Sequence, residues 1–118
     1  MRVLITGHLG YVGPVMVRRF KEAGHTVVGL DIGYFHECAR PGRPIVLPDR
    51  QVVRDMREVT VADVEGMDAI VHLAALSNDP MGALNPALTH DINHACTVRL
   101  ARLARQAGVQ RFVFASSC

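Results

Sequence analysis

The feature that most constrains the fold is a β-prone run that leads into three evenly spaced glycines. Arg2–Thr6 reads RVLIT, and Gly7, Gly10 and Gly13 follow it at a spacing of three. A helical pattern over Tyr11–Ala23 starts among these glycines. This order predicts a buried strand, a tight turn and a helix whose N-terminal N–H groups can receive an anion such as phosphate. An ordinary glycine-rich turn without a ligand is the alternative.

Each glycine has a separate expected role in this unit. Gly7 allows the tight turn, Gly10 lets the backbone approach a pyrophosphate, and Gly13 lets the helix pack closely on the sheet. Glycines at this spacing are weak evidence by themselves, and they gain meaning from the strand before them and the helix after them. The sequence therefore indicates a nucleotide-binding turn.

The rest of the chain continues the alternation of strands and helices. Further strands are expected at Thr26–Asp31, Gln51–Val53, Asp68–Ala74 and Gln110–Ala115, and further helices at Thr60–Glu65 and from Asn85-Pro86 to Gly108. Strands that are joined through helices pair in parallel, with right-handed crossovers. We therefore expect an α/β fold of the Rossmann type. It is a doubly wound parallel sheet with strand order 3-2-1-4-5, helices on both faces, and a ligand crevice between strands 1 and 4.

Local signals refine this expectation. Asn85 and Pro86 suit the N-cap and first position of the longest helix, and Thr60 with Asp63 forms a capping-box pattern. The buried stripe expected on the longest helix consists of Leu88, Ile92, Ala95, Cys96, Leu100, Leu103 and Ala107. Gly33–Asp49 holds three prolines and two glycines and is expected to be a long surface loop.

Composition limits the classes of protein to which the chain can belong. Its 118 residues fit one domain, so residues 1–118 are expected to form a single cofactor-binding unit. A net charge of +2 gives no reason to expect a nucleic-acid partner, and no apolar run is long enough to span a membrane. Three cysteines without a CxxC pair disfavour a disulfide framework or a metal site and fit the reducing cytoplasm.

Asp31 closes the second expected strand, 24 positions after Gly7. A carboxylate at this place can accept hydrogen bonds from both ribose hydroxyls of an adenosine, and it repels a 2′-phosphate. This residue predicts a preference for NAD over NADP. The alternative is that Asp31 only caps a turn.

In these motifs the chain resembles the extended short-chain dehydrogenase/reductases, and among them the NAD-dependent sugar-nucleotide epimerases and dehydratases. The resemblance runs over essentially the whole chain. It rests on the glycine spacing, Asp31, Asp55-Met56, the segment VHLAA at 71–75, Asn93 and the segment FVFASS at 112–117.

The resemblance implies a role for each matching position. The backbone of Tyr11 and Val12 would contact the pyrophosphate, and Asp55 with the backbone of Met56 would contact the adenine. The residues Leu73, Ala74 and Ala75 would line the cofactor near the nicotinamide ribose, Asn93 would brace the site, and Ser117 would be the catalytic serine that hydrogen-bonds the reacting sugar oxygen.

Several of these residues also have a purely structural interpretation. Asp55 suits a turn cap, Asn93 suits a hydrogen bond to core backbone, and Ser117 suits a strand end. His72 lies between apolar residues and is interpreted as a hydrogen-bonded core histidine, and Cys96 as a small apolar packing residue.

The family resemblance also implies a Tyr-x-x-x-Lys pair after the fifth strand, with the tyrosine as general base. The sequence has no lysine after Lys21 and no tyrosine after Tyr34. We therefore expect the chain to be the N-terminal, NAD-binding part of a larger enzyme that acts on a nucleotide sugar, and to be inactive alone. A non-catalytic NAD(P)-binding sensor and a reductase of small carbonyl compounds are the alternatives.

One further expectation concerns association. The fifth strand, with its run Phe112–Ala115, is expected at the edge of the sheet, where apolar β-prone strands tend to pair with another chain. The sequence therefore predicts a homodimer or other self-association.

Overall fold

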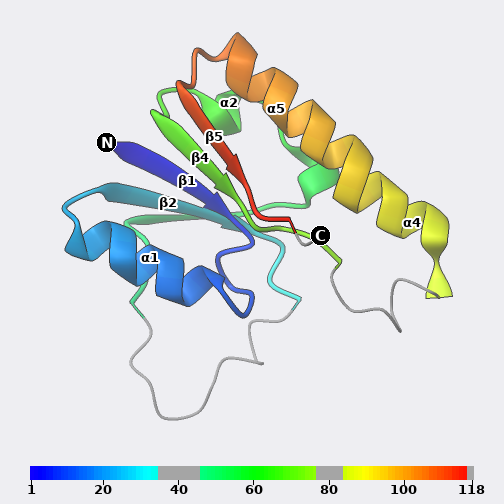
Figure 1. The fold of residues 1–118 in the computed structure, drawn as a ribbon, viewed down its shortest axis with the longest axis horizontal. Coiled ribbons are helices and arrows are strands. Elements are labelled where there is room, and N and C mark those ends of the chain that lie inside the picture. The colour runs from blue at the N-terminus through cyan, green and yellow to red at the C-terminus, as the bar shows by residue number, and fades with distance from the viewer. Residues whose placement is uncertain (35–45, 77–83, 117–118) are drawn as a thin grey trace.

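The computed structural model describes residues 1–34, 46–76 and 84–116 (Figure 1). The elements in chain order are β1 (Arg2–Thr6), α1 (Gly13–Glu22), β2 (Thr26–Asp31), β3 (Arg50–Val53), the 3-10 helix η2 (Met56–Glu58), α2 (Val61–Val64), β4 (Ala69–His72), α4 (Pro86–His90), the π-helical segment η3 (Asp91–Ala95), α5 (Cys96–Gln106) and β5 (Arg111–Phe114).

The five strands form one parallel sheet in the order β3-β2-β1-β4-β5. This confirms the strand order predicted from the sequence. In the register of the sheet, Thr6 at the end of β1 lies opposite Leu30 on one side and His72 on the other. The carboxyl ends of the three central strands therefore meet at one edge, from which the glycine-rich turn emerges.

Helices cover both faces of this sheet, as predicted (Figure 1). The alternation along β1 decides which side chains go where: Leu4 packs into the core under α5, whereas Val3 and Ile5 pack into the core under α1. The strands of the sheet centre are buried on both faces, as the continuous apolar run of β1 requires.

The local signals at helix ends are also confirmed. Asn85 caps α4, with its side-chain oxygen accepting a hydrogen bond from the Leu88 N–H at 3.0 Å, and Pro86 is the first helical residue. Thr60 and Asp63 form the predicted capping box at α2. These caps satisfy N–H groups that the first turn of a helix leaves without a partner.

The longest helical stretch differs from the expected uniform α-helix. Its middle, Asp91–Ala95, is π-helical, and this wider turn shifts the side chains that follow around the helix. The buried stripe differs from the predicted one at two positions. Ala95, in the π-helical segment, is exposed, whereas Ala104, which the prediction left out, is 3% exposed and follows Leu100 at ordinary α-helical spacing. Cys96 and Leu100 are buried as predicted.

Most other element boundaries shift by one or two residues. The first helix begins at Gly13 instead of Tyr11, so residues 7–12 are all turn, and β4 ends at His72, two residues before the prediction. Most of the predicted loop, and Ser117 with Cys118, lie outside the described residues. None of the described helices is long and apolar enough to cross a membrane.

Candidate functional site

The glycine-rich turn leaves β1 at the carboxyl edge of the sheet and packs there against two neighbouring segments. Gly7 has a φ of 72°, and a Cβ at this position would lie 2.7 Å from the backbone nitrogen of Ala74. A Cβ on Gly13 would lie 2.3 Å from the carbonyl oxygen of His8. Both glycines are therefore required by the fold itself, because no side chain fits there.

Gly10 is different. Among the described residues, a Cβ on Gly10 would meet only the Gly7 carbonyl oxygen, at 3.3 Å. The helix that follows has Val12 as its N-cap, which offers no capping side chain, and its first turn holds no acidic residue. No side chain caps the positive end of the α1 dipole, an arrangement that suits a phosphate.

Asp31 connects the end of β2 to this turn. Its Oδ2 accepts a hydrogen bond from the Leu9 N–H at 3.0 Å, and its Oδ1 accepts one from the Gly33 N–H at 2.8 Å. The turn-capping role that the sequence left open is therefore present. A carboxylate has about four acceptor positions, so two backbone donors leave capacity for ribose hydroxyls.

A chain of hydrogen bonds joins the segment after β4 to α5. The Ala74 N–H donates to Thr6 Oγ1 at 3.3 Å, Thr6 Oγ1 lies 2.6 Å from His72 Nδ1, and His72 Nε2 lies 2.8 Å from Thr97 Oγ1. Thr97 Oγ1 in turn donates to the Asn93 carbonyl at 2.9 Å. Since the Thr97 proton is used there, His72 Nε2 carries the hydrogen and Nδ1 accepts from Thr6.

The environment of His72 is that of a core histidine, as the sequence suggested. Its side chain is fully buried, and burial lowers its pKa to about 4. Both ring nitrogens have partners, so a neutral ring satisfies the whole chain of hydrogen bonds. The role of His72 is to fix Thr6 and, through it, the segment that follows β4.

Asn93 holds the same segment from the helix side. Its Oδ1 accepts from the Leu76 N–H at 2.7 Å, and its Nδ2 donates to the Leu76 carbonyl at 2.9 Å. This paired contact fits the bracing role implied by the resemblance. Leu73 and Ala74 are half-buried beside the glycine-rich turn, and Ala75 is exposed.

The predicted adenine contacts Asp55 and Met56 lie where β3 leads into η2. Asp55 caps η2 by accepting from the Arg57 N–H at 2.8 Å, and its carboxylate also forms an ion pair with the Arg57 guanidinium at 2.6 Å. This side-chain hydrogen bond from Arg57 holds the pKa of Asp55 below its usual range. Met56 is 7% exposed, and its side chain belongs to the core.

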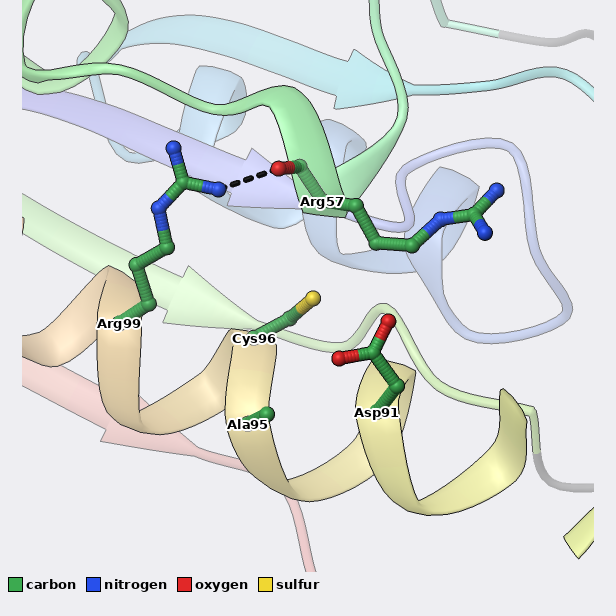
Figure 2. A pocket seen from close by; sticks show the side chains of 5 residues that line it. All are labelled: Arg57, Asp91, Ala95, Cys96 and Arg99. Atoms are coloured by element: carbon green, nitrogen blue, oxygen red, sulfur yellow. Dashed lines mark hydrogen bonds between the residues drawn. The ribbon is translucent and has the colours of Figure 1, made fainter. Parts of the chain in front are cut away.

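A shallow pocket of about 220 Å³ lies beside η2 (Figure 2). Its lining residues are Arg57, Asp91, Ala95, Cys96 and Arg99. The Arg99 guanidinium donates to the Arg57 carbonyl and so joins α5 to η2. Burial raises the pKa of the Cys96 thiol, which at 4% exposure packs as a small apolar side chain, as predicted.

The remaining predicted site residues lie at the tip of the turn and near the end of the chain. Tyr11 and Val12 are exposed at the tip of the turn, with their backbone at the start of α1. Ser117 lies outside the described residues. Among residues 1–34, 46–76 and 84–116, no group of three histidine, cysteine or acidic side chains is placed to hold a metal ion.

One residue of the turn makes contacts that the sequence did not predict. His8 is 3% exposed, and its Nε2 lies 3.1 Å from the Gln51 side-chain nitrogen. Burial lowers the pKa of His8, against the opposing effects of the Leu30 carbonyl and the Asp31 carboxylate. The signal that could have revealed this contact is Gly29, because a glycine inside a strand often marks the close approach of another group.

The geometry can be compared with known proteins. The model of the NAD dependent epimerase/dehydratase family matches residues 3–118. The chain belongs to this family. A UDP-glucose 4-epimerase of Mycolicibacterium smegmatis is 33% identical over 127 residues, which cover 99% of this chain and 39% of the relative. A 3-beta-hydroxysteroid dehydrogenase of Mycolicibacterium neoaurum is 35% identical over 121 residues, which cover 98% of this chain and 32% of the relative.

Solved structures of the family share the fold. The UDP-glucose-4-epimerase of Stenotrophomonas maltophila, with bound NAD and formylated UDP-arabinopyranose, superposes with a TM-score of 0.84 at 29% identity and covers 100% of this chain. The match takes in 37% of the epimerase chain. Family membership and the Rossmann-type sheet expected from the sequence are both confirmed. The chain spans well under half the length of these three similar proteins.

Proposed function

We propose that residues 1–118 form an NAD-binding Rossmann domain, and that this domain is the cofactor-binding part of a nucleotide-sugar epimerase or dehydratase. The observation that carries the proposal is the turn between β1 and α1. A Cβ on Gly7 or Gly13 would collide with neighbouring backbone, whereas among the described residues a Cβ on Gly10 would meet only the Gly7 carbonyl oxygen, at 3.3 Å, and the N-terminus of α1 nearby has no side-chain cap. This cradle suits a pyrophosphate, which the backbone N–H groups of Tyr11 and Val12 would hold.

The adenosine half of the cofactor has matching groups at the neighbouring strand ends. Asp31 would accept the ribose hydroxyls with the acceptor positions that Leu9 and Gly33 leave, and its charge would oppose a 2′-phosphate. Asp55 and the backbone of Met56 would face the adenine from the end of β3. The ion pair with Arg57 keeps the Asp55 carboxylate ionised and fixed in direction.

The nicotinamide half would lie past β4. Leu73, Ala74 and Ala75 would line it, and Asn93 would keep this segment in place through its two bonds to Leu76. When bound, NAD supplies an acceptor and donor of hydride, and the domain supplies binding and orientation. Ser117 would hydrogen-bond the reacting oxygen of the sugar.

Catalysis would need groups beyond these. The printed sequence holds no Tyr-x-x-x-Lys pair, so it has no evident general base for the sugar hydroxyl. We therefore propose that the chain alone binds cofactor without turning over a nucleotide sugar, and that β5 mediates association with a second copy. The exposed fractions of Val113 and Phe114, 57% and 47%, fit such a contact.

Calorimetric titration tests the proposal. The chain is titrated with NAD, NADP and UDP-glucose in separate experiments, and is then assayed for epimerisation of UDP-glucose with NAD present. We expect one NAD per chain, weaker binding of NADP, and no turnover. Absence of NAD binding by the folded chain would overturn the assignment, and turnover would overturn the claim that the catalytic groups are missing.

A second candidate has an observation of its own. The hydroxysteroid dehydrogenase from Mycolicibacterium neoaurum is as similar to this chain as the epimerase from Mycolicibacterium smegmatis. The shared residues belong to the cofactor half, so the cofactor proposal is the same for both. The two functions differ in net chemistry, because a dehydrogenase leaves the hydride on the cofactor and NADH accumulates. To separate the two functions, the full-length protein is mixed with NAD and either a hydroxysteroid or a nucleotide sugar, and the absorbance of NADH is followed. A rise in absorbance indicates the dehydrogenase, and sugar conversion without a rise indicates the epimerase.

A further inference from the structure

The side chain of His8 is an exception in the glycine-rich turn. Of residues 7–12, only His8 is buried, although the turn projects from the edge of the sheet. Its ring lies over β2 at Gly29, where a Cβ would come within 2.5 Å of the ring Cγ and 2.7 Å of Nδ1. The missing side chain of Gly29 therefore creates the notch that the imidazole fills.

The ring is also tied to the third strand. The Gln51 side-chain nitrogen lies 3.1 Å from His8 Nε2, so a neutral ring accepts the amide N–H. The other nitrogen, Nδ1, makes no hydrogen bond of ordinary geometry within the described residues. Burial lowers the pKa of the ring, against the smaller raising effects of the Leu30 carbonyl and of the Asp31 carboxylate, from the end of β2.

The backbone around His8 is fixed on both sides. The Gly7 N–H donates to the Leu30 carbonyl at 2.8 Å, and the Leu9 N–H donates to Asp31 at 3.0 Å. Gly13, the first residue of α1, packs against the backbone of His8. A displacement of His8 would therefore move the start of α1, where the turn is proposed to receive the pyrophosphate.

From this geometry we infer that His8 is a positioning residue of the cofactor site. Its imidazole fills the Gly29 notch, bonds to Gln51, and so holds the turn in the conformation that receives the pyrophosphate. The inference rests on the proposed NAD-binding function. The ring lies inside the fold and acts through the backbone of the turn, so its effect is on ligands that carry the diphosphate group.

The test compares ADP-ribose, which has the diphosphate group, with adenosine, which has none. The variants of the full chain are His8→Ala, Gly29→Ala and the double variant. His25→Ala is the matched control, because His25 lies at the opposite end of β2, next to Phe20. Calorimetry gives both affinities, hydrogen–deuterium exchange follows the amides of residues 10–13 without ligand, and urea unfolding reports stability.

We expect His8→Ala to weaken ADP-ribose binding by about tenfold or more and to leave adenosine binding within about twofold. Amide exchange in residues 10–13 should quicken, and His25→Ala should change neither quantity. Gly29→Ala should also weaken ADP-ribose binding, because its Cβ displaces the ring. In the double variant the methyl group introduced at position 29 fills a notch that no longer holds a ring. The decrease in ADP-ribose affinity should therefore be smaller than the sum of the decreases in the two single variants.

Two results would overturn the inference. The first is a His8→Ala variant with unchanged affinity for ADP-ribose and unchanged amide exchange. The second is a variant in which the affinities for ADP-ribose and adenosine fall equally and in step with a lower free energy of unfolding. If the unmodified chain binds no ADP-ribose, the proposed function fails. The exchange data then still decide whether His8 positions the turn.

Discussion

At the scale of single residues, the directions of the hydrogen bonds around His72 carry information that distances alone do not. Thr97 gives its proton to the Asn93 carbonyl, so His72 must donate from Nε2 and accept at Nδ1. The ring is therefore neutral in the fold, in agreement with its pKa of about 4. An ordinary histidine in the unfolded chain has a pKa of about 6.5.

This difference predicts how stability depends on pH. Between pH 6.5 and 4 the unfolded chain binds a proton at His72 that the folded chain does not, so the free energy of unfolding falls as the pH falls through this window. The neutral His72 ring contributes about 3 kcal/mol to the free energy of unfolding, and this contribution is fully present above the pKa of the unfolded chain. In urea unfolding at pH 7, His72→Asn should be less stable than the unmodified chain. On acidification to pH 4, the decrease in its free energy of unfolding should be smaller than that of the unmodified chain by about 3 kcal/mol. Equal losses in both proteins would contradict the assignment.

Asp31 carries the prediction of cofactor choice. Asp31→Asn removes the charge and one of the acceptors that hold Leu9 and Gly33, so NAD affinity should fall by about tenfold to a hundredfold while NADP affinity falls less. Calorimetric titration of both cofactors measures the ratio. Asp68→Asn is the matched control, because Asp68 also accepts from backbone, at 2.6 Å from the Arg2 nitrogen, but lies at the amino end of the sheet. An unmodified chain that binds NADP as tightly as NAD would contradict the role of Asp31.

At the scale of the elements, the glycine-rich turn separates requirements of folding from requirements of binding. A Cβ on Gly10 would meet only the Gly7 carbonyl oxygen among the described residues, so Gly10→Val should fold and, with its side chain in the place proposed for the pyrophosphate, bind no NAD. Gly13→Val drives a side chain into the His8 backbone, so it should unfold at much lower urea concentration. Urea unfolding and NAD titration of the two variants check this. Full NAD affinity in folded Gly10→Val would remove the phosphate role of the turn.

The elements also show where sequence reasoning succeeds and where it ends. The first residues of α4 and α2 were predictable, because Asn85, Pro86 and the Thr60–Asp63 pair act through contacts within one helical turn. The π-helical segment Asp91–Ala95 was not, because no local signal in the sequence marks it, and its Asn93 makes its two side-chain bonds to Leu76, 17 positions away. A stripe drawn with a uniform α-helical period therefore misplaced Ala95.

At the scale of the whole molecule, the sheet order was predictable because right-handed crossovers leave few arrangements for this alternation of strands and helices. The order also brings the glycine-rich turn, Asp31 and the segment after β4 to one edge. The contact of His8 with Gly29 and Gln51 was not predictable, because it joins residues 21 and 43 positions apart that only the assembled sheet brings together. The role of Ser117 stays a prediction.

The position of β5 gives a prediction for the molecule in solution. β5 pairs with β4 and ends the order of the described strands, and Val113 is 57% exposed on it. Val113→Lys should therefore shift self-association to higher protein concentration, because a buried charge opposes edge pairing. Light scattering over a dilution series measures this, with Val61→Lys on α2 as the control. An unmodified chain that is monomeric at every concentration would contradict the edge contact.

We propose above all that the carboxyl edge of this sheet binds NAD. The most direct measurement is an NMR titration of the isotope-labelled chain with NAD, followed through its backbone amide signals. We expect saturable shifts that concentrate in residues 7–13, 31–33, 55–56 and 73–76, with the signals from the amino ends of the strands unchanged. Shifts that fall elsewhere, or none at all in a folded chain at millimolar NAD, would contradict it.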